Sequence, residues 1–235
     1  MKGGRNVQEI PFGAVERALG VEQAAQNWVD LADARRGVAL LNAGLPGNVA
    51  TDGTLMLSLL RSVDLIGYNA GRPSGSAFEL DVARTFRYAL VPHAGDWRDA
   101  RVFRRGLEFN CPLLVRKVAP HRGSLAKRAS LWEASGTERA GGRDPADGPG
   151  GAVVLSAFKP GPAGSTIVRI YEAAGRAVEG ATIHVGGGVA KLASACEADL
   201  LEEAGRPLVL DGDAIRVDLH PFEIKTLRLD VAPAE

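Results

Sequence analysis

The sequence predicts an all-β protein with two β domains separated by a linker. Short runs of alternating apolar and polar residues recur along the chain, bounded by Gly, Pro and Asp, while sustained helical periodicity is rare. Residues 120–151 are dense in Gly, Pro, Ser, Arg and Asp and carry almost no apolar pattern. Strand-like runs then follow at a regular spacing that is typical of a small sandwich. We therefore divide the chain into residues 1–119, a linker or mobile loop at 120–151, and a terminal domain at 152–235.

Alternation of side chains predicts two well-defined strands in the first region. In the run from Gly53 to Ser62, apolar side chains occur on both faces, which predicts an interior strand covered on both sides. In the run that follows Arg84, the side chains of Phe86, Tyr88 and Leu90 share one face of a strand. That strand should stop at Pro92, because proline lacks the backbone donor that a sheet ladder requires.

One helix is expected in the first region, at about residues 97–109. Asp96 can cap its free amides, and Phe103 and Leu107 fall four residues apart on one helical face. The segment 12–33 remains open between helix and strand, because its Ala and Gln residues favour a helix whereas Gly13 and Gly20 interrupt one.

The terminal domain contains seven predicted strands. The sequence Asp211-Gly212-Asp213 lies between two of them and predicts a tight hairpin. In the last strand the apolar residues change parity, so we expect a β-bulge near Lys225 or Thr226. Leu131 and Trp132 are the sizeable apolar residues of the preceding linker, and they either dock on a neighbouring domain or stay exposed. The seven runs are VVLSAFK, TIVRIYEA, ATIHVGG, ACEADLLEE, PLVLDG, AIRVDL and FEIKTLRL.

The composition argues against a nucleic-acid-binding protein, a membrane-spanning protein and a disulfide-rich protein. The chain has 235 residues, of which 46% are hydrophobic and 24% charged, and its formal net charge is zero, so nothing global attracts nucleic acid or an anionic membrane. The sequence contains no apolar stretch approaching the ~20 residues of a membrane span, and we expect a soluble, cytoplasmic protein. Cys111 and Cys196 are too few for a disulfide framework or a cysteine-ligated metal site, so we expect buried thiols.

The spacing of the four histidines matches none of the short sequence motifs that are typical of catalytic or metal-binding histidines. His93, His121, His184 and His220 lack the His-x-Asp, His-x-x-x-His and His-Glu-x-x-His spacings, so each is expected to be structural or solvated. The triplet 186–188 is expected to be a turn between strands rather than a phosphate cradle, since no helix with a Lys-Ser or Lys-Thr pair follows it. No serine has the Gly-x-Ser-x-Gly context of a hydrolase nucleophile. The sequence predicts nothing about a pair of glycosidase carboxylates, because the fold decides which of its 28 Asp and Glu residues lie close together.

Six ordered stretches resemble the late β region of glycoside hydrolase family 38 α-mannosidases. The resemblance implies that residues 1–119 are the latter part of a β super-sandwich, similar to galactose mutarotase, and that residues 152–235 form the terminal β-sandwich of that family. The stretches are IPFGAVER at 10–17 with WVDLAD at 28–33, GVALLNAG at 37–44, TLMLSLLRS at 54–62, FRYALVPHAGDWRDA at 86–100, EADLLEE at 197–203 and LHPFEIKTLRL at 219–229.

Departures from the family pattern leave the substrate open. Many bacterial members continue GVALLN with a D-x-K-YGY stretch, whereas this chain has AGLPGNVATDG at 43–53. The VDLIGYNAGRP sequence after LLRS also replaces a Pro-Asp-Pro segment. Both features are closer to the mannosylglycerate-hydrolase-like branch.

The resemblance implies a retaining, zinc-dependent α-mannosidase whose two catalytic Asp residues and zinc ligands belong to an amino-terminal catalytic domain upstream of Met1. No catalytic or metal residue is therefore carried over, and the chain alone is expected to be inactive. Its expected partners are a catalytic domain or subunit and a mannoside or oligosaccharide. An alternative is a free-standing carbohydrate-binding or interaction module, and a third possibility is an intact enzyme with an unidentified carboxylate pair.

Four residues are candidates for contact with a sugar: Arg61, His93, Asp96 and Trp97. An arginine can hold hydroxyls or an acidic substrate group through its planar fork, and a tryptophan can stack on a sugar face. The alternative is that Arg61 and Asp96 form a structural ion pair and that Trp97 belongs to the core. We also expect an open apolar surface that would meet strands outside this chain; it consists of Leu55, Leu57, Leu59, Phe86, Tyr88 and Leu90.

Overall fold

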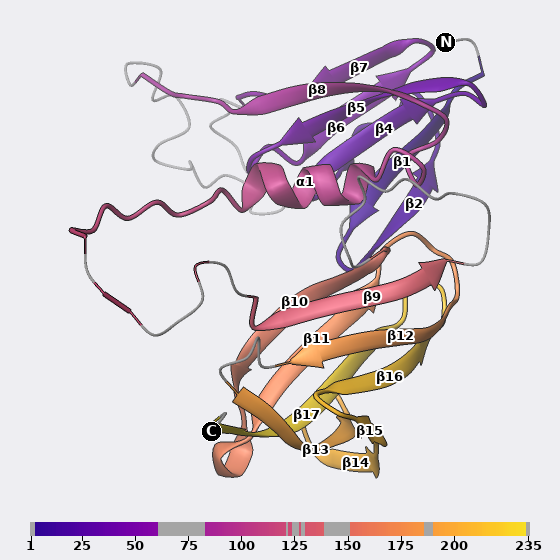
Figure 1. The fold of residues 1–235 in the computed structure, drawn as a ribbon. Coiled ribbons are helices and arrows are strands. Elements are labelled where there is room, and N and C mark those ends of the chain that lie inside the picture. Colours follow the sequence, from indigo (N-terminus) through magenta and orange to yellow (C-terminus); the bar gives the residue numbers. More distant parts are fainter. Residues whose placement is uncertain are drawn as a thin grey trace, which may run out of the picture. The chain divides into compact units, whose positions relative to one another are not determined.

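The protein is built almost entirely from β-strands, which confirms the predicted fold class (Figure 1). The computed structural model describes residues 3–60, 83–120, 122–123, 127, 130–138, 151–185 and 190–233. Contacts divide the chain into two compact units, which we call the first and second units. The first comprises Met1–Pro11 and Val15–Leu113, and the second comprises Phe12–Ala14 and Leu114–Glu235. No described helix is long and apolar enough to cross a membrane.

The first unit contains two sheets. A five-stranded sheet has the order β2-β1-β4-β5-β8, and a three-stranded sheet has the order β3-β6-β7. The segment that was ambiguous between helix and strand is β-structure. The strands are β1 (Arg5–Ile10), β2 (Gly13–Arg17), β3 (Gln23–Ala24), β4 (Trp28–Ala32), β5 (Arg36–Asn42), β6 (Gly47–Thr51), β7 (Thr54–Leu57) and β8 (Tyr88–Ala94).

The middle of the five-stranded sheet is covered on both faces. Every residue of β4 is buried, and most of β5 is buried as well. The two strands are antiparallel, with Trp28 opposite Leu41 and Ala32 opposite Gly37. A run such as WVDLA, which is apolar except for Asp30, is typical of a strand in this position, since neither of its faces meets water.

Two predictions about strands of the first unit are wrong. Among the described strands, β7 is an edge strand rather than an interior one, and its Met56 side chain is 47% exposed. Apolar residues on both faces therefore do not by themselves place a strand inside a sheet. β8 continues through Pro92 to Ala94, because it lies at the sheet edge, where a missing backbone donor can be tolerated.

Helix α1 (Val102–Asn110) begins later than predicted. Asp96 still acts as a cap, but of the turn that precedes the helix, since its Oδ1 accepts hydrogen bonds from the amides of Arg98 and Asp99. The chain then passes through Arg101 in a left-handed conformation before α1 starts. Gly106 lets the helix approach β4 closely, because a Cβ at this position would lie 2.7 Å from Trp28 Cδ1.

The second unit is a sandwich of two sheets around an apolar core. One sheet has the order β10-β11-β17-β13-β14 and the other β15-β16-β12-β9. The strands are β9 (Trp132–Glu138), β10 (Val153–Pro160), β11 (Thr166–Glu172), β12 (Val178–Val185), β13 (Ala190–Ala198), β14 (Ala204–Pro207), β15 (Leu210–Asp211), β16 (Ala214–Leu219) and β17 (Ile224–Pro233); a short 3₁₀ turn, η1, covers Pro162–Gly164.

The core of the sandwich consists of side chains from both sheets that alternate with outward-facing residues. Along β16 the alternation is visible in sequence, because Ile215, Val217 and Leu219 are buried whereas Arg216 and Asp218 are exposed. The core cluster comprises Ala134, Val153, Val168, Ile170, Val178, Ala181, Ile183, Leu192, Ala195, Ile215, Val217, Leu219, Leu227 and Leu229.

Strand β9 lies inside the predicted linker, and β14 is a further short strand, so the described part of the sandwich has nine strands rather than seven. Its backbone pairs with β12, from Val185 opposite Trp132 to Val178 opposite Glu138. Trp132 packs against the core cluster, while Leu131 is 52% exposed. The sequence did not predict β9, because the segment WEASGTE is mostly polar and lacks alternating apolar residues. The strand is held by its pairing with β12.

The hairpin prediction is confirmed, and the bulge prediction is wrong. β15 and β16 pair with Asp211 opposite Ala214, which leaves a two-residue turn with Gly212 at positive φ. The ladder between β11 and β17 is continuous through Lys225 and Thr226. The parity change needs no bulge, because Phe222 precedes the strand, in a turn where its own φ is 58°, and Ile224, the first residue of β17, is only half-buried whereas Leu227 and Leu229 are buried.

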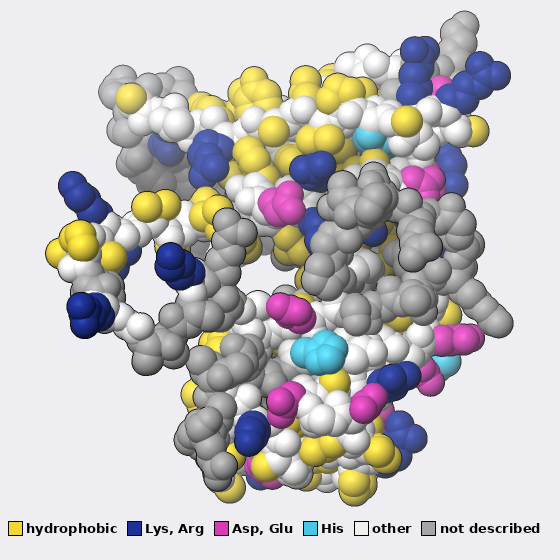
Figure 2. Space-filling model, viewed as in Figure 1, with side chains coloured by type: hydrophobic (Ala, Val, Ile, Leu, Met, Phe, Trp, Pro, Cys, Tyr) yellow, Lys and Arg dark blue, Asp and Glu magenta, His cyan; other side chains and the backbone are white. Residues whose placement is uncertain are grey.

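The expected apolar surface of the first unit is partly exposed. Leu59, Tyr88 and Leu90 are 40%, 53% and 62% exposed, while Leu55, Leu57 and Phe86 are half-buried. Figure 2 shows hydrophobic side chains gathered over β7 and β8. That this surface meets strands outside the chain stays a prediction.

Candidate functional site

A pocket of about 410 Å³ lies within the first unit, at one face of the five-stranded sheet. Strands β1 and β4 form its floor, and the turns that follow β4 and β8 form its rim. Its lining is polar for a pocket at a sheet face, with several carboxylates and one guanidinium. The lining residues are Gly3, Arg5, Val7, Asp30, Ala32, Asp33, Ala34, Gly95, Asp96, Trp97 and Asp99.

Strand alternation explains which side chains reach the pocket. In the antiparallel register, Arg5 lies opposite Ala32 and Val7 lies opposite Asp30, so these four side chains share one face. The intervening residues point to the other face, where Gln8 Nε2 donates to Asn48 Oδ1 of β6 at 3.0 Å.

A buried histidine–carboxylate pair lies beside the pocket floor. His93 Nε2 is 2.7 Å from Asp30 Oδ1, and the two side chains are 6% and 0% exposed. Asp30 Oδ2 has no hydrogen-bond partner among the described residues. Burial raises the pKa of Asp30, while the hydrogen bond and charge of His93 act in the opposite direction.

Gly37 makes this pairing possible, because Asp30 and His93 come from strands that β5 separates. The three residues Ala32, Gly37 and His93 form one cross-strand row. A Cβ at Gly37 would lie 2.4 Å from His93 Cε1 and 2.7 Å from Ala32 Cβ. The imidazole can therefore extend over β5 towards Asp30 only because residue 37 has no side chain.

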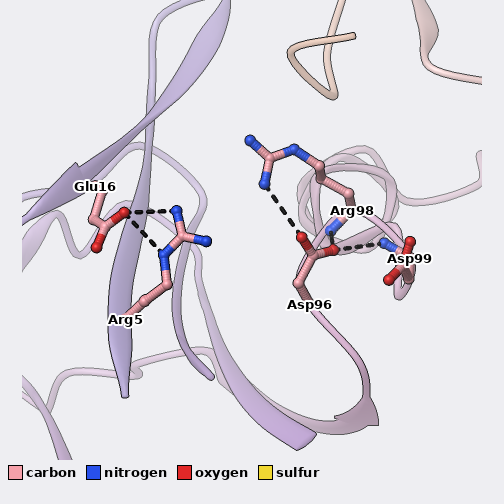
Figure 3. Close-up of polar contacts among 5 residues, drawn as sticks. All are labelled: Arg5, Glu16, Asp96, Arg98 and Asp99. Atoms are coloured by element: carbon pink, nitrogen blue, oxygen red, sulfur yellow. Dashed lines mark hydrogen bonds and ion pairs between the residues drawn. The ribbon is translucent and has the colours of Figure 1, made fainter. Parts of the chain in front are cut away.

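Two charged groups lie at the rim (Figure 3). Arg5 holds Glu16 Oε2 with its Nε and Nη2 at 2.9 and 2.6 Å. Asp96 accepts the amides of Arg98 and Asp99, and its Oδ2 lies 3.2 Å from Arg98 Nη1.

The charges at the rim are fixed by these partners. The pKa of Arg5 is raised by its hydrogen bond to Glu16 and by the Glu16 charge. Partial burial raises the pKa of Asp96, but the amides of Asp99 and Arg98 and the Arg98 guanidinium together outweigh it, so the net shift is downward. Asp96 is thus held as a carboxylate at the pocket rim.

Trp97 is packed into the core of the first unit and is 2% exposed. Its ring centroid lies 5.2 Å from that of Trp28 and 6.4 Å from that of Phe103. The Arg98 guanidinium lies 4.4 Å from the Trp97 centroid. The ring borders the pocket, but these neighbours leave little of it open for stacking on a sugar.

Three of the four candidate residues therefore lie close to one another. Asp96 and Trp97 line the pocket, and His93 contacts it through Asp30. Arg61 lies outside the described residues, and so do His121 and the triplet 186–188. Asp96 has Arg98 as a described ion-pair partner.

Sequence reasoning missed Arg5 and Asp30. Asp30 stands in the WVDLAD stretch, where an acid between apolar residues of a buried strand was a signal that could have been used. Arg5 offered no comparable signal, because it precedes an ordinary strand. His184 and His220 are exposed, as expected for solvated residues.

The pocket offers hydrogen-bonding chemistry. Carboxylates accept from hydroxyl or ammonium groups, and a guanidinium donates to oxygen. In the part of the chain that the structure describes, no group of three or more His, Cys, Asp or Glu side chains could hold a metal ion. Zinc, which the family resemblance implies, thus has no fitting set of ligands among these described residues.

A segment of the second unit matches a defined domain family. Residues 152–227 match the family model described as "Glycosyl hydrolases family 38 C-terminal beta sandwich domain". This segment includes most of the sandwich strands, from β10 into β17.

Similarity to α-mannosidases extends along nearly the whole chain. Human "Alpha-mannosidase 2C1" is 29% identical over 96% of this chain, and "Alpha-mannosidase G" of Dictyostelium discoideum is 25% identical over 94%. The chain spans about a fifth of the length of these relatives: 20% of the first and 19% of the second.

Solved structures support the same fold. The crystal structure of an α-mannosidase from Enterococcus faecalis V583 superposes with a TM-score of 0.73 at 22% identity, covering 98% of this chain and 24% of that one. Another family 38 protein from Enterococcus faecalis gives a TM-score of 0.72, also at 22% identity, over 98% of this chain and 25% of that one. These structures show a shared fold, while the matched domain at residues 152–227 and the sequence similarity along the chain are both to the C-terminal β region of glycoside hydrolase family 38 α-mannosidases.

Proposed function

We propose that this chain is the non-catalytic C-terminal β portion of an α-mannosidase-like glycoside hydrolase and that it helps to wall the sugar site of a catalytic region. The observation that carries the proposal is the similarity of 96% of the chain to one continuous fifth of an α-mannosidase. The pocket of the first unit supplies groups suited to this role, with Arg5 as donor and Asp96 as acceptor for sugar hydroxyls.

The chemistry of bond cleavage belongs, in this proposal, to a family 38 catalytic region on the same or another polypeptide. That region would supply the carboxylates and the zinc ion, which acts as a Lewis acid towards the sugar. The residues of this chain would bind and orient a mannoside or oligosaccharide. The natural substrate is left open by the sequence departures at 43–53.

Reconstitution tests the proposal. The purified chain would be mixed with a separately produced family 38 catalytic region from the same genome, and hydrolysis of an aryl α-mannoside would be followed with zinc present. We expect no turnover by the chain alone and a rise in turnover on mixing. Turnover by the chain unaided, or tight zinc binding through its own side chains, would contradict the proposal.

The matched control for reconstitution is a chain with Glu133 changed to alanine, since Glu133 is exposed on β9 in the second unit. It should restore turnover as well as the unchanged chain. Asp96→Asn, at the pocket rim, should restore less activity and should act mainly by raising KM, because Asp96 would bind the sugar rather than react with it.

A second function, a free-standing carbohydrate-binding module, is favoured by one observation: all lining residues of the pocket belong to the first unit. A pocket complete within one unit can bind a ligand without a partner. Calorimetry with a mannoside distinguishes the two functions. Binding by the chain alone, with no effect of the chain on any catalytic region, would favour the module.

A further inference from the structure

We propose that residues 113–118, which we call the docking segment, add as a β-strand to a sheet of the family 38 catalytic region. The inference rests on the proposed function and names where the chain contacts that partner. The docking segment lies in none of the described helices or strands. In Figure 1 the chain runs on from α1 into this segment as an extended trace.

The first argument is the exposure of apolar side chains. Leu113, Leu114 and Val115 are 94%, 98% and 93% exposed, and Val118 is 63% exposed. Single exposed apolar residues are common on protein surfaces, but a contiguous run of them is typical of a surface that contacts a partner. A segment that only connects two regions is normally rich in Gly, Ser or charged residues, whereas four of these six residues are Leu or Val.

The second argument is the unpaired backbone. Among the described residues, no amide or carbonyl of the docking segment makes a hydrogen bond to another backbone group. The bond that precedes it joins the Cys111 amide to the Leu107 carbonyl at 2.8 Å. An extended apolar segment with free backbone groups can add to an open sheet edge, where main-chain hydrogen bonds supply affinity and alternate side chains fill pockets.

The side-chain pattern indicates the kind of sheet that the segment fits. As a strand it would carry apolar side chains on both faces, Leu113 and Val115 on one and Leu114 on the other. A strand of this kind is covered on both sides in its sheet. Strand β7 shows that such a pattern is not sufficient alone, but β7 pairs with β6, whereas the docking segment has no described strand beside it.

The start of the docking segment is fixed to the first unit. Asn110, the last residue of α1, donates from its Nδ2 to the Asn42 carbonyl at 2.9 Å. Asn42 lies opposite Tyr88 in the ladder of β5 and β8. The segment therefore departs from beside the beginning of β8, an edge strand whose Tyr88 and Leu90 are 53% and 62% exposed. One apolar partner surface can cover both.

The comparisons favour a family 38 region over a second copy of this chain as the partner. Human "Alpha-mannosidase 2C1" aligns with 96% of this chain over only 20% of its own length. The family 38 crystal structure with a TM-score of 0.73 covers 98% of this chain and 24% of that one. These proteins thus carry the counterpart of this chain together with a much longer polypeptide, which offers sheets that this chain does not contain.

Hydrogen exchange on the purified, full-length chain tests the inference. Amides of the docking segment should exchange rapidly in the chain alone. They should slow at least about tenfold when a separately produced family 38 catalytic region from the same genome is added in excess. Slow exchange in the monomeric chain alone, rapid exchange in the complex, or no binding at micromolar concentration would overturn the inference. Protection through a dimer of this chain, seen by ultracentrifugation, would assign the segment to a second copy and overturn it as well.

Proline and alanine variants separate strand pairing from side-chain contact. Leu114→Ala and Val115→Ala remove apolar contacts but keep the amides, so each should weaken binding by about tenfold. Leu114→Pro and Val115→Pro also remove an amide. Neighbouring amides of a strand point to opposite sides, so at least one proline variant should bind about tenfold more weakly again. Equal affinities of each proline variant and its alanine counterpart would rule out strand addition.

These variants should fold normally, because the two side chains are 98% and 93% exposed. The matched control is Leu201→Ala, at an 81% exposed leucine of the second unit, which should bind as the unchanged chain does. The proposed function is tested separately by turnover. Protection of the docking segment without any rise in hydrolysis would contradict that function and leave the docking site standing, whereas a rise in hydrolysis with an unprotected segment would do the reverse.

Discussion

The two units bury polar groups in different ways. The core cluster of the second unit is apolar throughout, and its buried polar residues among those described are Ser165, Glu172 and Thr226. Among the described residues, the first unit buries more of them: two carboxyl groups and four side-chain amides. These are Asn6, Gln8, Glu9, Asp30, Asn42 and Asn48.

The difference in buried polar groups between the two units bears on their stability and on where a ligand could bind. An apolar sandwich gains free energy from nearly every buried side chain. A sheet that buries carboxyl groups loses part of that gain unless each polar atom finds a partner. In the first unit Asp30 Oδ2 and Gln8 Oε1 have none among the described residues. Polar burial of this kind is typical of sites with a function beyond folding.

The largest expected effect on stability comes from changing Glu172, which is a charged residue buried in the second unit. Its buried carboxylate accepts the amides of Ala174, Gly175, Arg176 and Phe222 at 2.7–3.1 Å. Glu172→Ala would leave several buried donors without this acceptor, so we expect a loss of about 4 kcal/mol in the free energy of unfolding.

Hydrogen exchange of β11 amides would measure this loss in the second unit. Exchange of β4 amides, in the first unit, should change much less. Glu133→Ala, which removes an exposed glutamate from β9, is the control and should stay within about 0.5 kcal/mol of the parent. A loss below about 1 kcal/mol for Glu172→Ala would mean that the apolar core alone sets the stability of this unit.

The second largest expected effect is on the pH dependence of the stability of the first unit, through Glu9. Burial raises the pKa of Glu9 to about 7, and its hydrogen bonds with Asn27 oppose the shift only in part. A raised pKa in the folded state means that the folded chain binds the proton more tightly than the unfolded chain. The stability that Glu9 contributes is thus present below its ordinary pKa of 4.5 and is lost as the pH rises through about 7.

Glu9→Gln should abolish this pH dependence, because glutamine is neutral at every pH and keeps an oxygen for the Asn27 amide. At pH 8 the variant should be more stable than the parent by up to about 3 kcal/mol, and at pH 4 the two should be nearly equal. Urea unfolding at several pH values measures the difference. Parallel curves for parent and variant would show that Glu9 is well solvated in the folded state.

The smallest effect concerns Gly37. Gly37→Ala places a Cβ where the His93 ring and Ala32 lie, so His93 must move away from Asp30. Overpacking of this kind costs about 1–3 kcal/mol, and we expect about 2. The His93 imidazole signals in NMR should also change, whereas Gly123→Ala, at a glycine with open space around it, should leave both stability and these signals unaltered.

Local patterns were sufficient for much of the fold. Alternation predicted β16, and the Asp211-Gly212-Asp213 turn predicted the hairpin, because both depend on neighbours in the chain. The same reasoning failed for β7 and β9. The position of β7 in its sheet and the pairing of β9 with β12 depend on strands distant in sequence.

The candidate site was predictable only in part. The family resemblance indicates the turn with Asp96 and Trp97, but the sequence does not decide whether Trp97 stacks on a sugar or belongs to the core. In the structure Trp97 is buried, with the Arg98 guanidinium over its ring. The contact of His93 with Asp30 spans 63 positions and passes over Gly37. No local pattern encodes such a contact.

The sequence by itself determined that this chain is all-β, where most of its strands run, and which family it resembles, because alternation, turn residues and motif order are local properties. The tertiary structure alone decided that Arg5, Asp30 and Asp96 border one pocket and that Asp30 keeps an oxygen free. Those facts depend on the register of β1, β4, β5 and β8, and register joins residues that the chain itself keeps far apart.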